Sequence, residues 1–125
     1  MGIIKLDGAN SMLKELCERR PVASLPIAGR YRVIDFAVSN MVNSGVGNVG
    51  VLLSAKARSV FDHLRSGKDW DLARHRGGLS YLPSDPYDGQ PVTGDLSGLY
   101  HNMDYIQHTS AEYILVAQAD SVYNI

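Results

Sequence analysis

The sequence has a single cysteine, Cys17, and one tryptophan among its 125 residues, and it has no long hydrophobic run. One cysteine cannot form a disulfide within the chain, which fits the reducing environment of the cytoplasm. The longest apolar runs are far shorter than the roughly 18–20 residues that a transmembrane helix requires. The net charge of −1 provides no electrostatic attraction for nucleic acid. We therefore expect a cytoplasmic protein without a membrane or nucleic-acid partner.

The composition is that of one ordinary globular domain, with 45% hydrophobic and 20% charged residues. Short apolar segments alternate with segments whose apolar residues recur at helical spacing. Strands are expected at 2–6, 48–54, 79–82 and 113–117, and helices at 12–17, 34–45, 58–65 and 95–109. This alternation predicts an α/β fold whose mostly parallel sheet carries helices on both faces.

Three local features refine this prediction. The run 113–117 is continuously apolar, which is typical of a buried strand. Asp95 is expected to cap the helix 95–109 at its N-terminus. The polar segment 66–78 is expected to be a loop or a poorly buried helix, and 22–29 is expected to be extended or turn-like.

The stretch GVGNVG, residues 45–50, matches the glycine-rich fingerprint of dinucleotide-binding proteins. That fingerprint binds a pyrophosphate only where a strand enters the glycines and a helix leaves them. Here an expected helix precedes the glycines and an expected strand follows them. We therefore interpret them as a helix stop and a tight turn, without a dinucleotide site.

Residues 20–54 resemble sugar-nucleotide pyrophosphorylases, and are most similar to bacterial glucose-1-phosphate adenylyltransferases. The matching motifs are GRYRVIDF (29–36), SN (39–40), NSG (43–45) and NVGV (48–51). The resemblance continues through SGKDWDLARHRGGLSYLP (66–83) and AEYILVAQAD (111–120). It implies a Rossmann-like nucleotidyltransferase domain, of which residues 1–125 are expected to be the N-terminal portion. The rest of that domain and a left-handed β-helix domain are expected to lie outside this chain.

The family's reaction is attack by glucose 1-phosphate on the α-phosphate of ATP, which forms ADP-glucose and pyrophosphate. Charge that develops on the phosphates must be met by cations, backbone N–H groups and a carboxylate-held Mg²⁺. The resemblance places the nucleotide-binding loop at Leu6, Gly8 and Met12, and the metal-binding aspartate at Asp120. A turn-forming aspartate at a strand end is the alternative for Asp120.

The chain departs from the active members of the family at this loop. They carry an arginine where Met12 stands and a Lys-Pro pair where Val22 and Ala23 stand, whereas Asp7 replaces a glycine. Loss of one such donor commonly costs about 3–4 kcal/mol, or about 10²–10³ in rate. The pattern resembles the non-catalytic, GlgD-type subunit, which modulates a catalytic partner in glycogen synthesis. We therefore expect a vestigial nucleotide loop and no catalytic residue.

Arg19, Arg20 and Arg32 align with basic positions that bind the family's anionic effectors, which are sugar bisphosphates or AMP. The planar guanidinium suits phosphate recognition, although a solvated basic rim near a helix end is the alternative. The implied partners are a catalytic adenylyltransferase subunit in a hetero-oligomer, or further copies in a homo-oligomer, with a nucleotide or sugar-phosphate effector. Mg²⁺ is the cofactor of the family, and the lost cations leave open that this chain uses none.

Two further readings of the sequence stay open. One is an active adenylyltransferase with a divergent loop, against which Met12 and Val22 argue. The other is a sugar-nucleotide binding module without catalysis. The histidines predict no metal site, since His101 and His108 are too far apart on one helix to share an ion.

Overall fold

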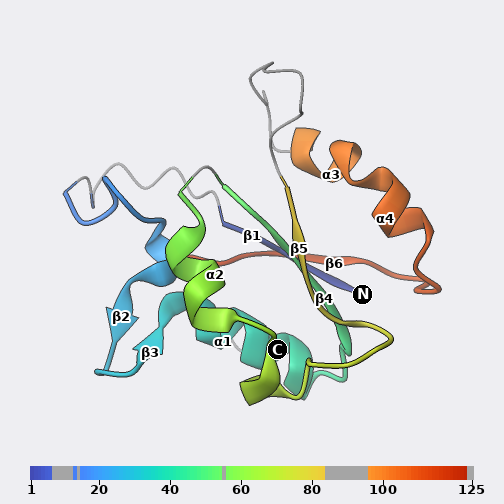
Figure 1. Ribbon diagram of the computed structural model, residues 1–125, viewed down its shortest axis with the longest axis horizontal. Helices are drawn as coiled ribbons and strands as arrows, with labels where there is room; N and C mark the ends of the chain where they lie inside the picture. Colours follow the sequence, from blue (N-terminus) through green and yellow to red (C-terminus); the bar gives the residue numbers. More distant parts are fainter. Residues whose placement is uncertain (7–12, 14, 55, 84–95, 124–125) are drawn as a thin grey trace.

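The computed structural model describes residues 1–6, 13, 15–54, 56–83 and 96–123 (Figure 1). Its centre is a four-stranded sheet in the spatial order β5-β4-β1-β6, and each neighbouring pair is parallel. The strands are β1 (Gly2–Lys5), β4 (Asn48–Leu52), β5 (Gly78–Leu82) and β6 (Leu115–Gln118). The predicted α/β fold with a parallel sheet is confirmed, and the four expected strands are all present.

Helices α1 (Val33–Asn43) and α2 (Arg58–Leu64) cover one face of the sheet (Figure 1). Successive side chains of a strand point to opposite faces, so Ile4 and Val51 point to this larger core. Helix α1 contributes the buried residues Ile34, Ala37, Val38 and Met41. Their spacing is the amphipathic period from which the helix was predicted.

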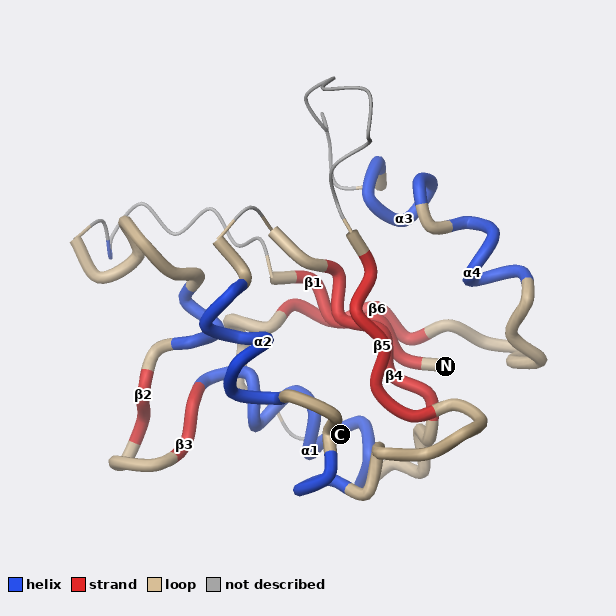
Figure 2. Tube along the Cα trace, viewed as in Figure 1, coloured by secondary structure: helices blue, strands red, loops and turns tan. Residues whose placement is uncertain are grey.

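The helices α3 (Ser97–His101) and α4 (Met103–Gln107) lie on the other face (Figure 2). There Ile3 and Leu52, the sequence neighbours of Ile4 and Val51, form a smaller cluster with Leu82. The side chains packed against this cluster from α3 and α4 are Leu99, Tyr105 and Ile106. The prediction of helices on both faces is therefore confirmed.

The single helix predicted over 95–109 is wrong, because α3 and α4 are separate five-residue helices. The break falls at Asn102, which is 9% exposed. Its amide donates to the carbonyl of Pro83 (2.7 Å) and to the carbonyl of Gly98 (2.9 Å). Side-chain bonds of asparagine to the backbone compete with regular helix geometry. The predicted cap, Asp95, lies outside the described residues.

Asn102→Ala is expected to destabilise the protein by about 1–3 kcal/mol, because the substitution leaves two inward carbonyls without their donor. The free energy of unfolding would be measured by urea denaturation of the full chain. Gln107→Ala, on the exposed side of α4, is the matched control and should stay within about 0.5 kcal/mol of wild type. Equal losses in both variants would contradict a special role for the Asn102 amide.

The burial predicted for the apolar run 113–117 is also wrong. The strand β6 begins at Leu115, and Leu115 and Val116 are 41% and 44% exposed. In the described part of the chain, β6 is one of the two outer strands, together with β5, and it pairs only with β1. An outer strand keeps one edge unpaired, so its residues remain more accessible than those of β1 or β4.

The segments between these elements differ from prediction in detail. Residues 22–32 form the 3₁₀ helix η2 (Val22–Ser24) and a hairpin of β2 (Pro26–Ile27) and β3 (Tyr31–Arg32). The polar segment 66–78 contains the 3₁₀ helix η3 (Lys68–Trp70). Of the predicted helix 12–17, the described residues form one turn, in which Leu16 is 56% exposed. No helix in the described ranges is long and apolar enough to cross a membrane.

Candidate functional site

The strand order places a topological switch point between β1 and β6. From β1 the chain adds β4 and then β5 on one side, and it returns to place β6 on the other side. In such sheets, ligands bind beyond the carboxyl ends of the two strands at the switch. Here those ends lead to Leu6, which is 3% exposed, and to Asp120. The predicted residues Leu6 and Asp120 therefore follow adjacent strands, whereas Gly8 and Met12 lie outside the described residues.

Asp120 has a side chain that can bind magnesium, but few other potential ligands accompany it among the described residues. Mg²⁺ in nucleotide sites is held by one or two carboxylates together with substrate phosphates. Asp120 supplies one carboxylate, whose Oδ1 accepts a hydrogen bond from the hydroxyl of Ser121 at 3.3 Å. Within the described ranges, no group of three His, Cys, Asp or Glu side chains could hold a metal ion. Asp120 thus fits an ion that arrives with phosphates, and the described residues form no complete metal site by themselves.

A second candidate is a cleft of about 490 Å³ beside the C-terminal end of α2. We call it the Arg32 cleft. Its basic lining residues are Arg32, His63, Arg65 and Lys68, and its carboxylates are Asp62 and Asp69. Three permanently cationic side chains face two carboxylates, so the lining carries a small positive excess before any histidine is protonated.

Arg32 is fixed in this cleft through both its backbone and its side chain. It is the N-cap of α1, and its backbone N–H donates to Oδ2 of Asp35 at 2.9 Å. Its Nη1 donates to the carbonyl of Ser59 in α2 at 3.1 Å. A guanidinium has five N–H donors, so most of them remain for a ligand. The predicted effector residue Arg32 is thus a tethered arginine at a cleft.

His63 contacts the same carboxylate from α2. Its Nε2 lies 2.7 Å from Oδ1 of Asp35, and the two side chains are 20% and 10% exposed. The ring of Trp70 meets His63 edge-on, with 6.4 Å between the ring centroids. The indole N–H of Trp70 in turn donates to the hydroxyl of Ser39 in α1 at 2.9 Å. The imidazole is therefore held by neighbours from α1 and η3.

Arg65 ends α2 in an uncommon backbone conformation, with φ of 49°. Such a conformation costs a non-glycine residue about 1–3 kcal/mol and needs support from its surroundings. Part of that support is Tyr81 of β5, whose hydroxyl donates to the carbonyl of Arg65 at 2.6 Å. Burial raises the pKa of Tyr81 to about 12, so the phenol stays a neutral donor under ordinary conditions. Strand β5 therefore anchors the end of α2 at the cleft.

The structure does not bring all three predicted effector arginines together. Arg19 and Arg20 are exposed, and neither lines the Arg32 cleft. Their segment is held near the start of α2, where Lys56 donates to the carbonyl of Glu18 at 2.6 Å. Conversely, the prediction missed His63 and Asp35, although Asp35 stands three residues after Arg32, where a capping carboxylate is expected.

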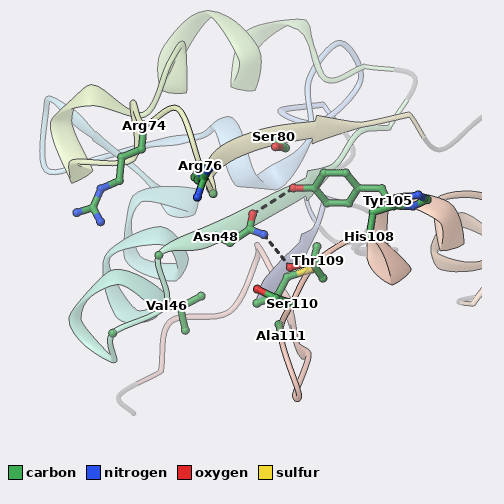
Figure 3. A pocket seen from close by; sticks show the side chains of 14 residues that line it. Val46, Asn48, Arg74, Arg76, Ser80, Tyr105, His108, Thr109, Ser110 and Ala111 are labelled. Carbon is green, nitrogen blue, oxygen red and sulfur yellow. Dashed lines mark hydrogen bonds between the residues drawn. The ribbon is translucent and has the colours of Figure 1, made fainter.

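Gly45 and Gly47 of the GVGNVG stretch line a third cavity, of about 780 Å³, at the amino end of the sheet (Figure 3). Gly45 follows α1 with φ of 82°, and β4 begins at Asn48. The interpretation as a helix stop and turn is confirmed for Gly45 and Gly47, whereas Gly50 lies within β4. Figure 3 shows that Asn48 accepts from Tyr105 (3.1 Å) and donates to Thr109 (3.2 Å). These bonds tie the C-terminal end of α4 to β4, at the end of the sheet opposite to the switch point.

Comparison with known proteins decides the family. The model of the family described as "Nucleotidyl transferase" matches the whole chain, residues 1–125. The chain belongs to the nucleotidyl transferase family. A solved structure assigned as a glucose-1-phosphate thymidylyltransferase from Bacillus anthracis aligns with a TM-score of 0.73 at 21% identity. That alignment covers 95% of this chain and 43% of the other, and it supports the Rossmann-like fold of this chain.

The relatives of this chain include proteins under two different names. The glycogen biosynthesis protein GlgD of Geobacillus stearothermophilus is 39% identical, and that of Bacillus subtilis is 34% identical. A glucose-1-phosphate adenylyltransferase of Thermotoga neapolitana is 36% identical over 98% of the chain. The chain spans 37% of the length of the two GlgD proteins and 30% of the Thermotoga enzyme. The resemblance drawn from the motifs is confirmed.

Proposed function

We propose that this chain is the N-terminal portion of a GlgD-type regulatory subunit of glucose-1-phosphate adenylyltransferase, acting in cytoplasmic glycogen biosynthesis. Its relatives, among them two GlgD proteins and the Thermotoga enzyme, support a role in that pathway. The subunit would assemble with a catalytic partner subunit or with copies of itself. The remaining half of the nucleotidyltransferase domain and a β-helix domain would belong to the same protein.

The observation that carries the regulatory role is the replacement of the catalytic Lys-Pro pair by Val22 and Ala23. Val22, which stands at the position of the lysine, begins η2 and is half-buried, and Ala23 beside it is 0% exposed in the larger core. An apolar side chain at this place supplies no charge to a polyphosphate. Asp120 would be the remnant of the metal site, and the loop with Leu6, Gly8 and Met12 the remnant of the nucleotide site.

The regulatory ligand would be a phosphorylated effector, AMP or a sugar bisphosphate, bound at the Arg32 cleft. Arg32 offers free N–H donors there, with Arg65 and Lys68 as further cations. Arg19 and Arg20 would act outside the cleft, at a surface shared with the partner subunit or with the effector. In that case the charge reversal Arg20→Glu should change the effector response of the assembled enzyme, and an unchanged response would remove Arg20 from the proposal.

Arg32→Ala is expected to weaken binding of AMP or fructose bisphosphate at least about tenfold, because it removes one charged hydrogen-bond donor and such a bond contributes about that factor to affinity. Isothermal titration of the full-length protein, alone and with its catalytic partner, measures this affinity. Arg30→Ala is the matched control, because Arg30 sits over the ring of Tyr31 at 5.8 Å and does not line the cleft. It should change the affinity by less than about twofold. Equal effects of both substitutions would contradict the proposed site.

A further inference from the structure

We propose that Asp35 is the positioning residue of the Arg32 cleft, and that anion binding there is coupled to proton uptake by the Asp35–His63 pair. The inference rests on the proposed effector site and specifies how that site is regulated. Asp35 holds two cleft residues from different elements, and His63 gains its charge only by protonation. The bound anion would be a phosphate or a phosphate ester.

Both carboxylate oxygens of Asp35 have partners in the structure. The residue is 7% exposed, and a buried carboxylate is stable only when its oxygens are hydrogen-bonded or paired. Oδ2 accepts from the backbone N–H of Arg32, and Oδ1 faces Nε2 of His63. Both partners line the cleft, whereas Asp35 does not. Asp35 therefore acts on a ligand through Arg32 and His63, without touching it.

His63 lies in a cleft that contains several charged side chains. Its charged partner is Asp35 from α1, and the other charged groups that line the same cleft are Arg32 from β3, Asp62 and Arg65 at the end of α2, and Lys68 and Asp69 from η3. An anion in the cleft favours the protonated imidazole, and Asp35 offers that imidazolium a charge-assisted hydrogen bond. A proton is then taken from solvent to His63 when the anion binds. Imidazole is the side chain suited to such exchange near neutral pH.

The role of Asp35 toward His63 can be distinguished from its role as a hydrogen-bond acceptor at the N-terminus of α1. An asparagine at position 35 can still accept the N–H of Arg32 through its amide oxygen, but it cannot neutralise an imidazolium. A purely structural Asp35 would lower the stability of Asp35→Asn and leave its proton uptake on binding unchanged. Loss of that uptake is therefore the decisive readout.

The experiment titrates inorganic phosphate and AMP into the full-length protein in buffers that differ in ionisation enthalpy, which reveals the protons taken up on binding. Wild type should take up protons. Asp35→Asn and His63→Gln should each bind about tenfold more weakly; His63→Gln should take up no proton, and Asp35→Asn should take up clearly fewer than wild type. The double variant should resemble either single variant in affinity, because residues that act as a unit are not additive. Asp62→Asn, which removes a carboxylate from the cleft lining, should bind the anion more tightly.

The outcomes separate the two proposals. Normal binding by Arg32→Ala would overturn the effector site itself. Weak binding by Arg32→Ala with normal affinity and proton uptake in Asp35→Asn would leave that site standing and overturn the role of Asp35. Should Asp35→Asn fail to fold, His63→Gln decides, since its side-chain amide can still bond to Asp35. Proton uptake that persists in His63→Gln would overturn the inference.

Discussion

Assayed alone, the full-length protein is expected to form ADP-glucose at least about 10²–10³-fold more slowly than the catalytic subunit proposed as its partner. Positive charge aimed at developing phosphate charge is usually the largest single contribution to such catalysis. By the resemblance of the motifs, Met12 and Val22 stand where the active members of the family carry an arginine and a lysine, and Asp7 adds a negative charge. Pyrophosphate release, measured with ATP, glucose 1-phosphate and Mg²⁺, reports the rate.

The same argument predicts a gain of function. Met12→Arg combined with Val22→Lys and Ala23→Pro should raise the rate by about 10² or more, since each restored donor contributes a factor of this size. Leu16→Arg is the matched control, because it adds a cation four residues after Met12 in the chain. The side chain of Leu16 is 56% exposed, and Leu16 is not one of the positions matched to the family's catalytic residues. This control should leave the rate unchanged. A wild-type protein that alone turned over at about 1–10³ s⁻¹, the usual range of enzymes, would exclude the regulatory role.

The largest effect on folding is expected for Gly78→Ala, which should lower the free energy of unfolding by about 2–5 kcal/mol. Gly78 has φ of 84°, and a Cβ there would lie 2.2 Å from the carbonyl oxygen of Leu72. Its neighbours are backbone atoms, Leu72 O and Arg74 N, so the contact cannot be relieved by turning a side chain. The loop 72–78 would have to move at the point where it enters β5.

Gly29→Ala separates the two causes of the expected loss, which are the left-handed backbone conformation and the close contact of the new Cβ with Leu72. Gly29 has φ of 88°, and a Cβ there would have no atom within 4 Å. It should lose only the conformational cost of a left-handed alanine, about 1–2 kcal/mol. Urea denaturation midpoints at constant m-value would compare the variants. Equal losses at both positions would show that the close approach to Leu72 is unimportant.

The elements with a strong local period were predictable from the sequence. Helix α1 places its apolar residues at 34, 37, 38 and 41, and this spacing is a local property of the chain. The order of strands and helices likewise predicted the parallel sheet. The break between α3 and α4 was not predictable, because it depends on the bond from Asn102 to Pro83, 19 residues away.

The candidate site divides in the same way. The sequence by itself determined the family, the place of Asp120 at the end of a strand, and Arg32 as a phosphate-binding candidate, because motifs and strand ends are contiguous in the chain. Only the tertiary structure decided that Arg32 and His63 share Asp35, and that Arg19 and Arg20 do not line the cleft. The reason is physical: Asp35 and His63 are 28 residues apart, and they meet only because α1 and α2 pack on the same face of the sheet.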